Sequence, residues 1–216
     1  MISQLLDFIL HINEHLTVMV STYGTYVYAI LFLIIFVETG LVIMPFLPGD
    51  SLLFAVGALC ANEINNLNIF YIIGLLIIAA VTGDNCNYAI GRYLGENIKG
   101  WNFRNKPLVK RDYIEKTESF FEKYGTKAII MARFIPIVRT FTPFVAGVGH
   151  MDYKRKFLPY DILGGTLWIT SMTVSGYYFG QIDWVKNHFE TVVILIVLIS
   201  ILPMLITYLK HRFSKK

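Results

Sequence analysis

The feature that most constrains this chain is a set of long apolar runs. Residues 64–83 carry no charged side chain over 20 positions, about the length that an α-helix needs to cross the hydrocarbon core of a membrane. We predict three spanning segments, at 64–92, 157–182 and 191–209. Hydrophobic residues make up 55% of the chain and charged residues 16%, whereas soluble domains have about 45–50% and about 25%. The composition argues against a soluble enzyme and indicates an integral membrane protein.

The basic residues are confined to one part of the chain. All 19 Lys and Arg lie at or after Arg92, and the first 91 residues have none. Because Lys and Arg concentrate in the cytoplasmic loops of membrane proteins, residues 96–127 and the basic tail 210–216 are expected in the cytoplasm. The N-terminus lacks the basic region of a standard signal peptide, so none is expected there. We predict a multi-pass protein with a cytoplasmic C-terminus.

Two other segments have the pattern of amphipathic helices. Residues 1–23 place Leu5, Ile9 and Ile12 at helical spacing with polar residues on the other faces, which predicts a helix that lies in the membrane interface. Residues 96–127 are predicted to form a cytoplasmic amphipathic segment.

Two apolar segments, 26–59 and 128–151, are broken in the middle by Pro and Gly. The predicted bends are at Pro45, Pro48 and Gly49 in the first segment and at Pro136 and Pro143 in the second. Basic residues flank 128–151 on both sides, so this segment is predicted to be a re-entrant hairpin that opens to the cytoplasm. Residues 58–68 have no basic side chain, so 26–59 is predicted to be a second hairpin that opens to the opposite face. The alternative is a full span at 26–46 with a separate return.

A weak internal repeat relates the two halves. The sequence GRYLG at 91–95 resembles GYYFG at 176–180, and Pro48 and Pro136 precede these motifs by 43 and 40 residues. Inverted repeats with broken helices are typical of transporters, because unwound backbone at membrane depth must line a cavity or lie inside protein. The predicted fold is therefore a single all-α membrane domain, 1–216, with two facing re-entrant hairpins.

Four charged side chains lie inside the apolar hairpins: Glu38, Asp50, Arg133 and Arg139. Each costs at least about 2.5–3.5 kcal/mol at the centre of a membrane, so they must pair or face water. The planar fork of arginine suits phosphate, so Arg133 and Arg139 are candidate phosphate-binding residues. A carboxyl group buried in a membrane can take a proton near neutral pH, so Glu38 and Asp50 are candidates for proton coupling. The alternative is a pair of structural ion pairs that fasten the hairpins.

Asp84 and Arg92 are secondary candidates, with anchoring of the helix end as the alternative role. The two cysteines, Cys60 and Cys86, show neither disulfide nor zinc spacing, and the five histidines show no metal pattern. No metal and no cofactor is expected.

Several long motifs resemble the DedA family of bacterial inner-membrane proteins, which share the VTT (SNARE-associated) domain with eukaryotic lipid scramblases. The resemblance covers roughly residues 24–182 and rests on FVETGLVIMPFLPGDSLLFAVGAL, GDNCNYAIGRYLG and FFEKYGTKAIIMARFIPIVRTFTPFVAGVGHM. It implies two facing re-entrant hairpins, movement of lipids between leaflets, and functional roles for Glu38, Asp50, Arg133 and Arg139. It also implies recycling of undecaprenyl phosphate or transport of phosphatidylethanolamine, with dependence on the proton-motive force.

The expected function is a transporter of a lipid with an anionic headgroup in the bacterial inner membrane, with undecaprenyl phosphate as the leading substrate. The alternatives are a phosphatidylethanolamine or general phospholipid scramblase, a proton-coupled exporter of small ions or drugs, and a scaffold. A lipid phosphatase is disfavoured because no histidine lies inside either hairpin before His150 and no Ser/His/Asp set is evident. The expected partners are the lipid and protons, with no nucleic acid, and a homo-oligomer is left open.

Overall fold

The computed structural model describes residues 22–41, 49–61, 67–94 and 121–189, with short pieces at 18, 102–103, 106–107, 119, 191–192 and 194–196. The described elements are helical except for one antiparallel pair of two-residue strands, β1 (Asn102–Phe103) and β2 (Lys106–Pro107), which the sequence did not predict. The predicted all-α class is therefore confirmed. Pro45, Pro48, the tail 210–216 and most of the predicted segments 1–23, 96–127 and 191–209 lie outside the described residues.

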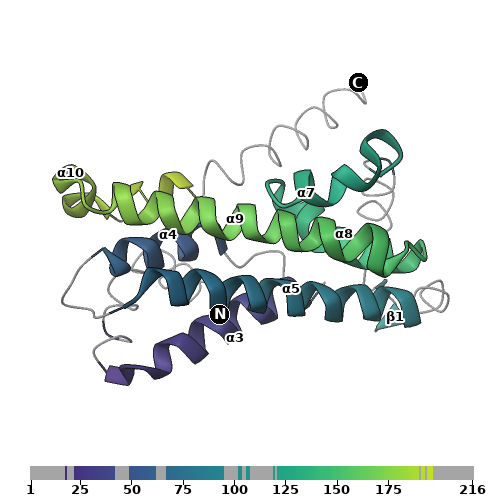
Figure 1. Cartoon of the computed structure of the whole chain (residues 1–216), viewed down its shortest axis with the longest axis horizontal. Helices are drawn as coiled ribbons and strands as arrows, with labels where there is room; N and C mark the ends of the chain where they lie inside the picture. Colours follow the sequence, from purple (N-terminus) through teal and green to yellow (C-terminus); the bar gives the residue numbers. More distant parts are fainter. Residues whose placement is uncertain are drawn as a thin grey trace. The chain divides into compact units, whose positions relative to one another are not determined.

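The described α-helices are α3 (Tyr26–Gly40), α4 (Gly49–Cys60), α5 (Ile69–Leu94), α7 (Ala128–Ala132), α8 (Pro136–Val148), α9 (Leu158–Phe179) and α10 (Asp183–Asn187) (Figure 1). Two short helical turns, η3 (Gly125–Lys127) and η4 (Tyr153–Phe157), precede α7 and α9. Within α5, Ile69–Tyr93 is long and apolar enough to cross a membrane, and its most apolar stretch of 18 residues has a mean hydropathy of 1.9. At 1.5 Å per residue, the 22 residues of α9 extend about 33 Å, but among the described helices only α5 is both long and apolar enough to cross a membrane, so the predicted span at 157–182 stays a prediction.

The chain forms two compact units. Unit 1 comprises residues 1–31, 48–75 and 169–216, and unit 2 comprises residues 32–47 and 76–168. Helices α3, α5 and α9 each contribute residues to both units, whereas α4 and α10 belong to unit 1 and α7 and α8 to unit 2.

In unit 2, the predicted second hairpin doubles back on itself. The helix breaks between Ala132 and Pro136, where Ile135 has extended backbone (φ −121°, ψ 103°). A proline disfavours helical backbone at the residue before it and fits the first turn of the helix that it begins. Ile129 at the start of the segment and Ala146 near its end then join the same apolar cluster. Both ends of the segment therefore pack at the same place on unit 2.

Glycines set a close backbone crossing between α5 and α8 in unit 2. A Cβ atom on Gly91 would overlap the carbonyl group of Phe144, and one on Gly147 would overlap the carbonyl of Tyr88. The two helices therefore touch through their backbones, with no room for a side chain between them.

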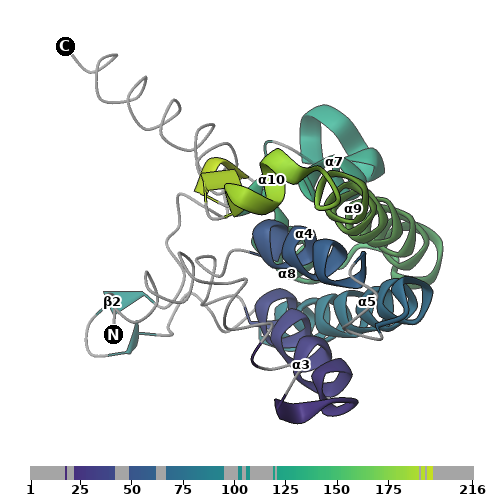
Figure 2. The same ribbon diagram turned by 90° about the vertical axis from the view of Figure 1, so that its left-hand side faces the viewer.

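The same crossing occurs in unit 1 between α4 and α9, which lie side by side in Figure 2. A Cβ on Gly176 would overlap the carbonyl of Phe54, and one on Gly57 would overlap the carbonyl of Thr173. Each contact has a Phe-x-x-Gly sequence on the helix after a predicted bend, FAVG at 54–57 and FVAG at 144–147.

These matching crossings give the internal repeat a physical basis. They pair residue 54 with 144 and residue 91 with 176, whereas the proline comparison pairs Pro48 with Pro136. The crossings thus relate α4 to α8 at a separation of 90 residues, two more than the prolines indicate. Each of these two helices packs on the long helix of the other half of the sequence.

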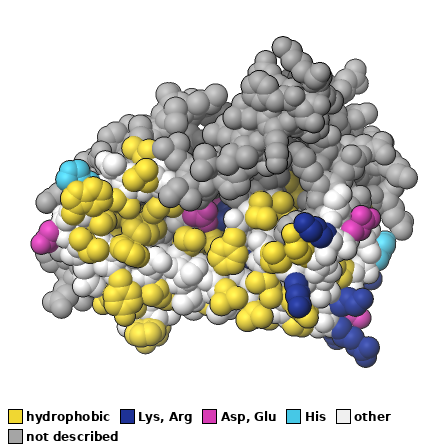
Figure 3. All heavy atoms as spheres, turned by 90° about the horizontal axis from the view of Figure 1, so that it is seen from above, with side chains coloured by type: hydrophobic (Ala, Val, Ile, Leu, Met, Phe, Trp, Pro, Cys, Tyr) yellow, Lys and Arg dark blue, Asp and Glu magenta, His cyan; other side chains and the backbone are white. Residues whose placement is uncertain are grey.

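The long helices carry large apolar side chains on their outer surfaces. On α5, Phe70 is 81% exposed and Ile78 57%, and on α9, Leu163 is 50% exposed and Leu167 48%. Figure 3 shows hydrophobic side chains over wide areas of one face of the described residues. Exposed apolar area of this kind calls for an apolar surrounding, as a lipid bilayer supplies.

Candidate functional site

The first buried ion pair joins the two predicted hairpins. Glu38, in the last turn of α3, accepts a hydrogen bond of 2.5 Å at Oε1 from Nη2 of Arg139, which lies in the first turn of α8. Both side chains are buried, and the guanidinium carbon of Arg139 lies 4.4 Å from the ring centre of Trp168 on α9. The structure therefore brings together an acid of the first segment and an arginine of the second, and it adds a stacked aromatic ring.

The second cluster holds Arg133 between two aspartates. Its Nη2 donates to Oδ1 of Asp161 at 2.5 Å and also forms an ion pair with Oδ2 of Asp84. The exposed fractions of Arg133, Asp84 and Asp161 are 3%, 1% and 0%. These two acids come from α5 and α9 and not from the first hairpin.

The local sequence of α9 makes room for Arg133. A Cβ on Gly164 would lie 3.2 Å from Cγ of Arg133, and one on Gly165 would lie 3.7 Å from its Nη2. These glycines follow Asp161 at i+3 and i+4, so they share its face of the helix. Asp161 and the two glycines thus form one surface that receives the arginine.

Asn87 of α5 connects the two hairpins through their backbones. Its Nδ2 donates to the carbonyl of Thr39 at 3.2 Å and to that of Thr140 at 2.9 Å, and its side chain is fully buried. Thr39 lies at the end of α3, where carbonyl groups lack partners within the helix. Thr140 lies in α8. Asn87 therefore satisfies a carbonyl at the end of α3 and ties it to the backbone of α8.

The other predicted residues lie as follows. Asp50 is in the first turn of α4, is partly buried and belongs to unit 1, so its place in the site remains a prediction. Gly49 begins α4 and is buried. Arg92 is exposed in the last turn of α5, where it donates a 3.0 Å hydrogen bond to Tyr88 Oη. Asp84, by contrast, is buried and forms an ion pair with Arg133. The two secondary candidates therefore lie in different surroundings.

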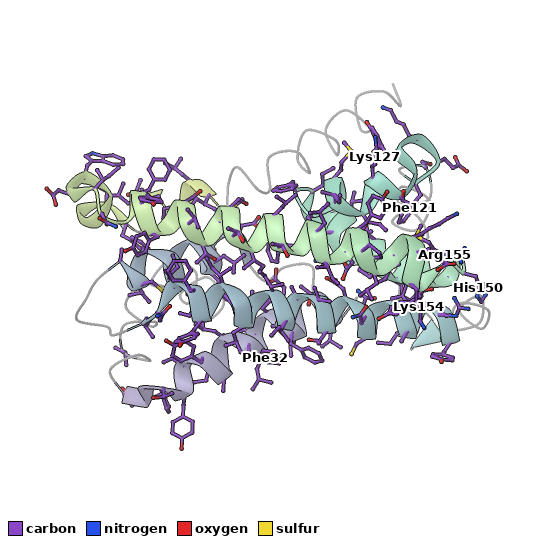
Figure 4. All side chains as sticks on the ribbon, in the orientation of Figure 1. Phe32, Phe121, Lys127, His150, Lys154 and Arg155 are labelled. Atoms are coloured by element: carbon purple, nitrogen blue, oxygen red, sulfur yellow. The ribbon has the colours of Figure 1, made fainter. Side chains whose placement is uncertain are left out.

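A basic pocket lies at the end of α5 within unit 2. It has a volume of about 810 Å³, and its lining includes Arg92, His150, Lys154 and Arg155. Figure 4 shows His150, Lys154 and Arg155 together at this end of the unit. The pocket thus joins the end of α5 to the basic segment that precedes α9, two regions that the distribution of basic residues predicts on the same side of the membrane.

Three residues at the site were not selected from the sequence. Asp161 lies beside the basic residues 154–156 and so resembles an interfacial charge. Asn87 is neutral, so it does not stand out among apolar residues. Trp168 has the appearance of a packing residue. The one usable signal was the spacing of Asp161 from Gly164 and Gly165, which marks a helix face with room for a long partner.

The arrangement is suited to exchange of anions. Two guanidinium groups, each with a planar set of donors, are held by carboxylates inside apolar helices. Arginine binds phosphate with the same fork that it offers to a carboxylate. An incoming phosphate could therefore replace a carboxylate at either arginine without leaving the cation unpaired.

The buried charges, the glycine crossings and the apolar helix surfaces define a helical membrane protein. The chain belongs to the DedA family, whose VTT domain model matches residues 47–178. It is 50% identical over 208 residues to Protein DedA of Escherichia coli K12, which covers 96% of this chain and 94% of that protein.

More distant relatives are also membrane proteins. An uncharacterized membrane protein of Mycobacterium tuberculosis H37Rv is 39% identical over 87% of this chain and 81% of its own length. Inner membrane protein YghB of E. coli K12 is 33% identical over 81% of this chain and 78% of its own length. No solved structure matches the chain.

Proposed function

We propose that the protein carries a lipid with an anionic phosphate headgroup across the bacterial inner membrane and that undecaprenyl phosphate is its leading substrate. The observation that carries this proposal is the burial of two arginines, each neutralised by carboxylates, where hairpin arms meet long apolar helices. A buried charge at membrane depth is costly and is typical of a substrate or ion path.

The proposed path starts at the basic pocket and ends at the buried arginines. Arg92, Lys154 and Arg155 would attract the headgroup at the membrane surface, where its charge is still solvated. Arg133 and Arg139 would then bind the phosphate in exchange for their carboxylates, while the lipid tail stays in the bilayer. Protonation of a displaced carboxyl group would lower the cost of this exchange.

The proposed topology follows from the basic residues. The two hairpins enter the membrane from opposite faces, and 92–127, 154–156 and the C-terminal tail face the cytoplasm. The sharing of one pocket by Arg92, Lys154 and Arg155 supports this layout.

A liposome assay tests the proposal. Purified protein is incorporated into liposomes that contain labelled undecaprenyl phosphate or labelled phosphatidylethanolamine, and the accessibility of each label is followed with and without a pH gradient. We expect the protein to move undecaprenyl phosphate faster than empty liposomes do, and faster still when a pH gradient is imposed. Movement of phosphatidylethanolamine alone would contradict the choice of substrate.

The same samples separate a carrier from an enzyme. We propose that the protein does not hydrolyse its substrate, so incubation with a lipid phosphate should release no inorganic phosphate. Release that depends on Arg133 would contradict the carrier mechanism.

A further inference from the structure

The cluster around Arg133 has one more negative than positive charge. Among the described residues, the charged groups that face one another here are Glu38 of α3, Asp84 of α5, Arg133 after α7, Arg139 of α8 and Asp161 of α9. Arg139 is paired with Glu38, and Arg133 is the guanidinium group that contacts both aspartates. Three carboxylates therefore share two guanidinium groups inside the protein.

Solvent does not reach this excess negative charge and so cannot stabilise it. Asp84 and Asp161 are 1% and 0% exposed, and both lie against the same nitrogen of Arg133. Two like charges that share a buried site do not both ionise without a large cost, and a carboxyl group avoids this cost by taking a proton.

The hydrogen bonds of the cluster are also incomplete. Oδ2 of Asp161 and Nη1 of Arg133 are buried and lack a hydrogen-bond partner among the described residues. A buried polar atom without a partner costs about 1–3 kcal/mol. A protonated carboxyl group gains a donor, which a carboxylate lacks, so a proton would alter this pattern as well as the charge.

We propose that Asp84 and Asp161 share one exchangeable proton and that the Asp84–Arg133–Asp161 cluster is a proton-binding site of the protein, distinct from Glu38 and Asp50. The reaction is the addition of H⁺ to a carboxylate oxygen and its later release, with no other bond changed. Its use in transport rests on the proposed function. A proton on either aspartate loosens the hold on Arg133 and favours a phosphate there, and by linkage a bound phosphate favours the proton.

Infrared difference spectroscopy of the purified full-length protein without added lipid tests this site. As the pH is lowered within the range above about 5, where exposed carboxyl groups stay largely ionised, we expect a carboxylic acid C=O band that is absent at high pH. Because one aspartate and one arginine form a neutral pair, either Asp84→Asn or Asp161→Asn should abolish this band. The exposed-site control Glu122→Gln should retain it. Thermal unfolding of each variant confirms that it is folded.

Two results would overturn the proposal. One is a band that survives in both folded asparagine variants, which would place the proton elsewhere. The other is the absence of a pH-dependent band in the wild-type protein, which would mean that a bound cation or a permanent proton neutralises the cluster. Because the measurement needs no lipid, failure of lipid movement with a normal band would refute the carrier and leave the proton site intact.

Discussion

At the scale of single residues, the ion pair between Glu38 and Arg139 illustrates how buried charges depend on one another. Each side chain is buried, and each neutralises the other at 2.5 Å. Breaking such a pair by removing one partner costs about 3–5 kcal/mol, because the remaining charge is left without compensation, whereas replacing both partners is often nearly neutral. The pair therefore constrains which substitutions the site can accept.

A double-mutant comparison tests this dependence. We expect Glu38→Gln and Arg139→Gln each to lower the free energy of unfolding by about 3–5 kcal/mol, and the double variant to recover more than half of the loss. The loss in Arg139→Gln should shrink as the pH falls, because Glu38 can take a proton. The loss in Glu38→Gln should persist, because a guanidinium group keeps its proton.

Denaturant unfolding in detergent at two pH values measures these losses, with Glu122→Gln as an exposed control. A double variant as unstable as the sum of the single variants would show that the two side chains are not coupled.

The sequence identified part of this site because charges inside apolar segments are conspicuous. Glu38, Arg133 and Arg139 stand out in this way, and the structure places all three in buried ion pairs. It could not assign partners, because the nearest acid to Arg133 depends on tertiary packing: the partners are Asp84 and Asp161, 49 residues before it and 28 after it. Asn87 gives no signal of charge and becomes visible only through its bonds to two backbones.

At the scale of helices, glycine sets how closely two backbones approach. Gly91 and Gly74 both lie in α5, but only Gly91 faces another backbone, that of Phe144 on α8. Around Gly74 there is no atom within 4 Å of an added Cβ. The two positions therefore separate the effect of packing from the effect of helix propensity.

Alanine at these positions should have opposite effects. Gly91→Ala must push α5 and α8 apart, so we expect a loss of about 1–3 kcal/mol in stability. Gly74→Ala should be neutral or stabilising by up to about 1 kcal/mol, because alanine favours a helix. The repeat predicts that Gly176→Ala in α9 behaves like Gly91→Ala.

Thermal unfolding of the purified variants provides the measurement. Equal melting temperatures for Gly91→Ala and Gly74→Ala would contradict the close crossing. A normal melting temperature for Gly176→Ala alone would contradict the equivalence of the two crossings.

Much of the helical layout could be predicted because the relevant signals are local. Pro136 and the apolar length of 64–92 indicate a break and a long helix, and the structure has both. The register between the helices could not be predicted as well. The prolines mark equivalent positions of the two halves only approximately, and the crossings depend on backbone contacts of Gly57 and Gly147 that only the folded structure shows. The strand pair at 102–107 lies in a polar segment without the alternation that predicts strands.

At the scale of the whole molecule, the proposed topology determines which surface meets the cytoplasm. A Cys-free variant, with Cys60 and Cys86 replaced, can carry single cysteines at chosen positions. We expect cysteines at Lys127, His150 and Ser214 to react with a membrane-impermeant reagent from the cytoplasmic side. A cysteine at Asn65 should react from the opposite side.

Labelling in intact cells and in inverted membrane vesicles distinguishes the two sides. If the cysteines at Lys127 and His150 react from opposite sides, then 128–151 crosses the membrane. That result would contradict the re-entrant hairpin. Reaction of Asn65 and Ser214 positions from the same side would contradict the inverted layout.

The central claim is that Arg133 and Arg139 bind the phosphate of a lipid that the protein moves across the membrane. The most direct test compares wild-type protein with the Arg133→Ala, Arg139→Ala double variant in liposomes that contain labelled undecaprenyl phosphate, with equal amounts of folded protein. Each lost arginine removes about 1.5–3 kcal/mol of charged hydrogen bonding, about 10- to 150-fold in affinity for a dry site. We predict that the double variant moves the lipid no faster than empty liposomes do. Lipid movement at the wild-type rate by a folded double variant would contradict the claim.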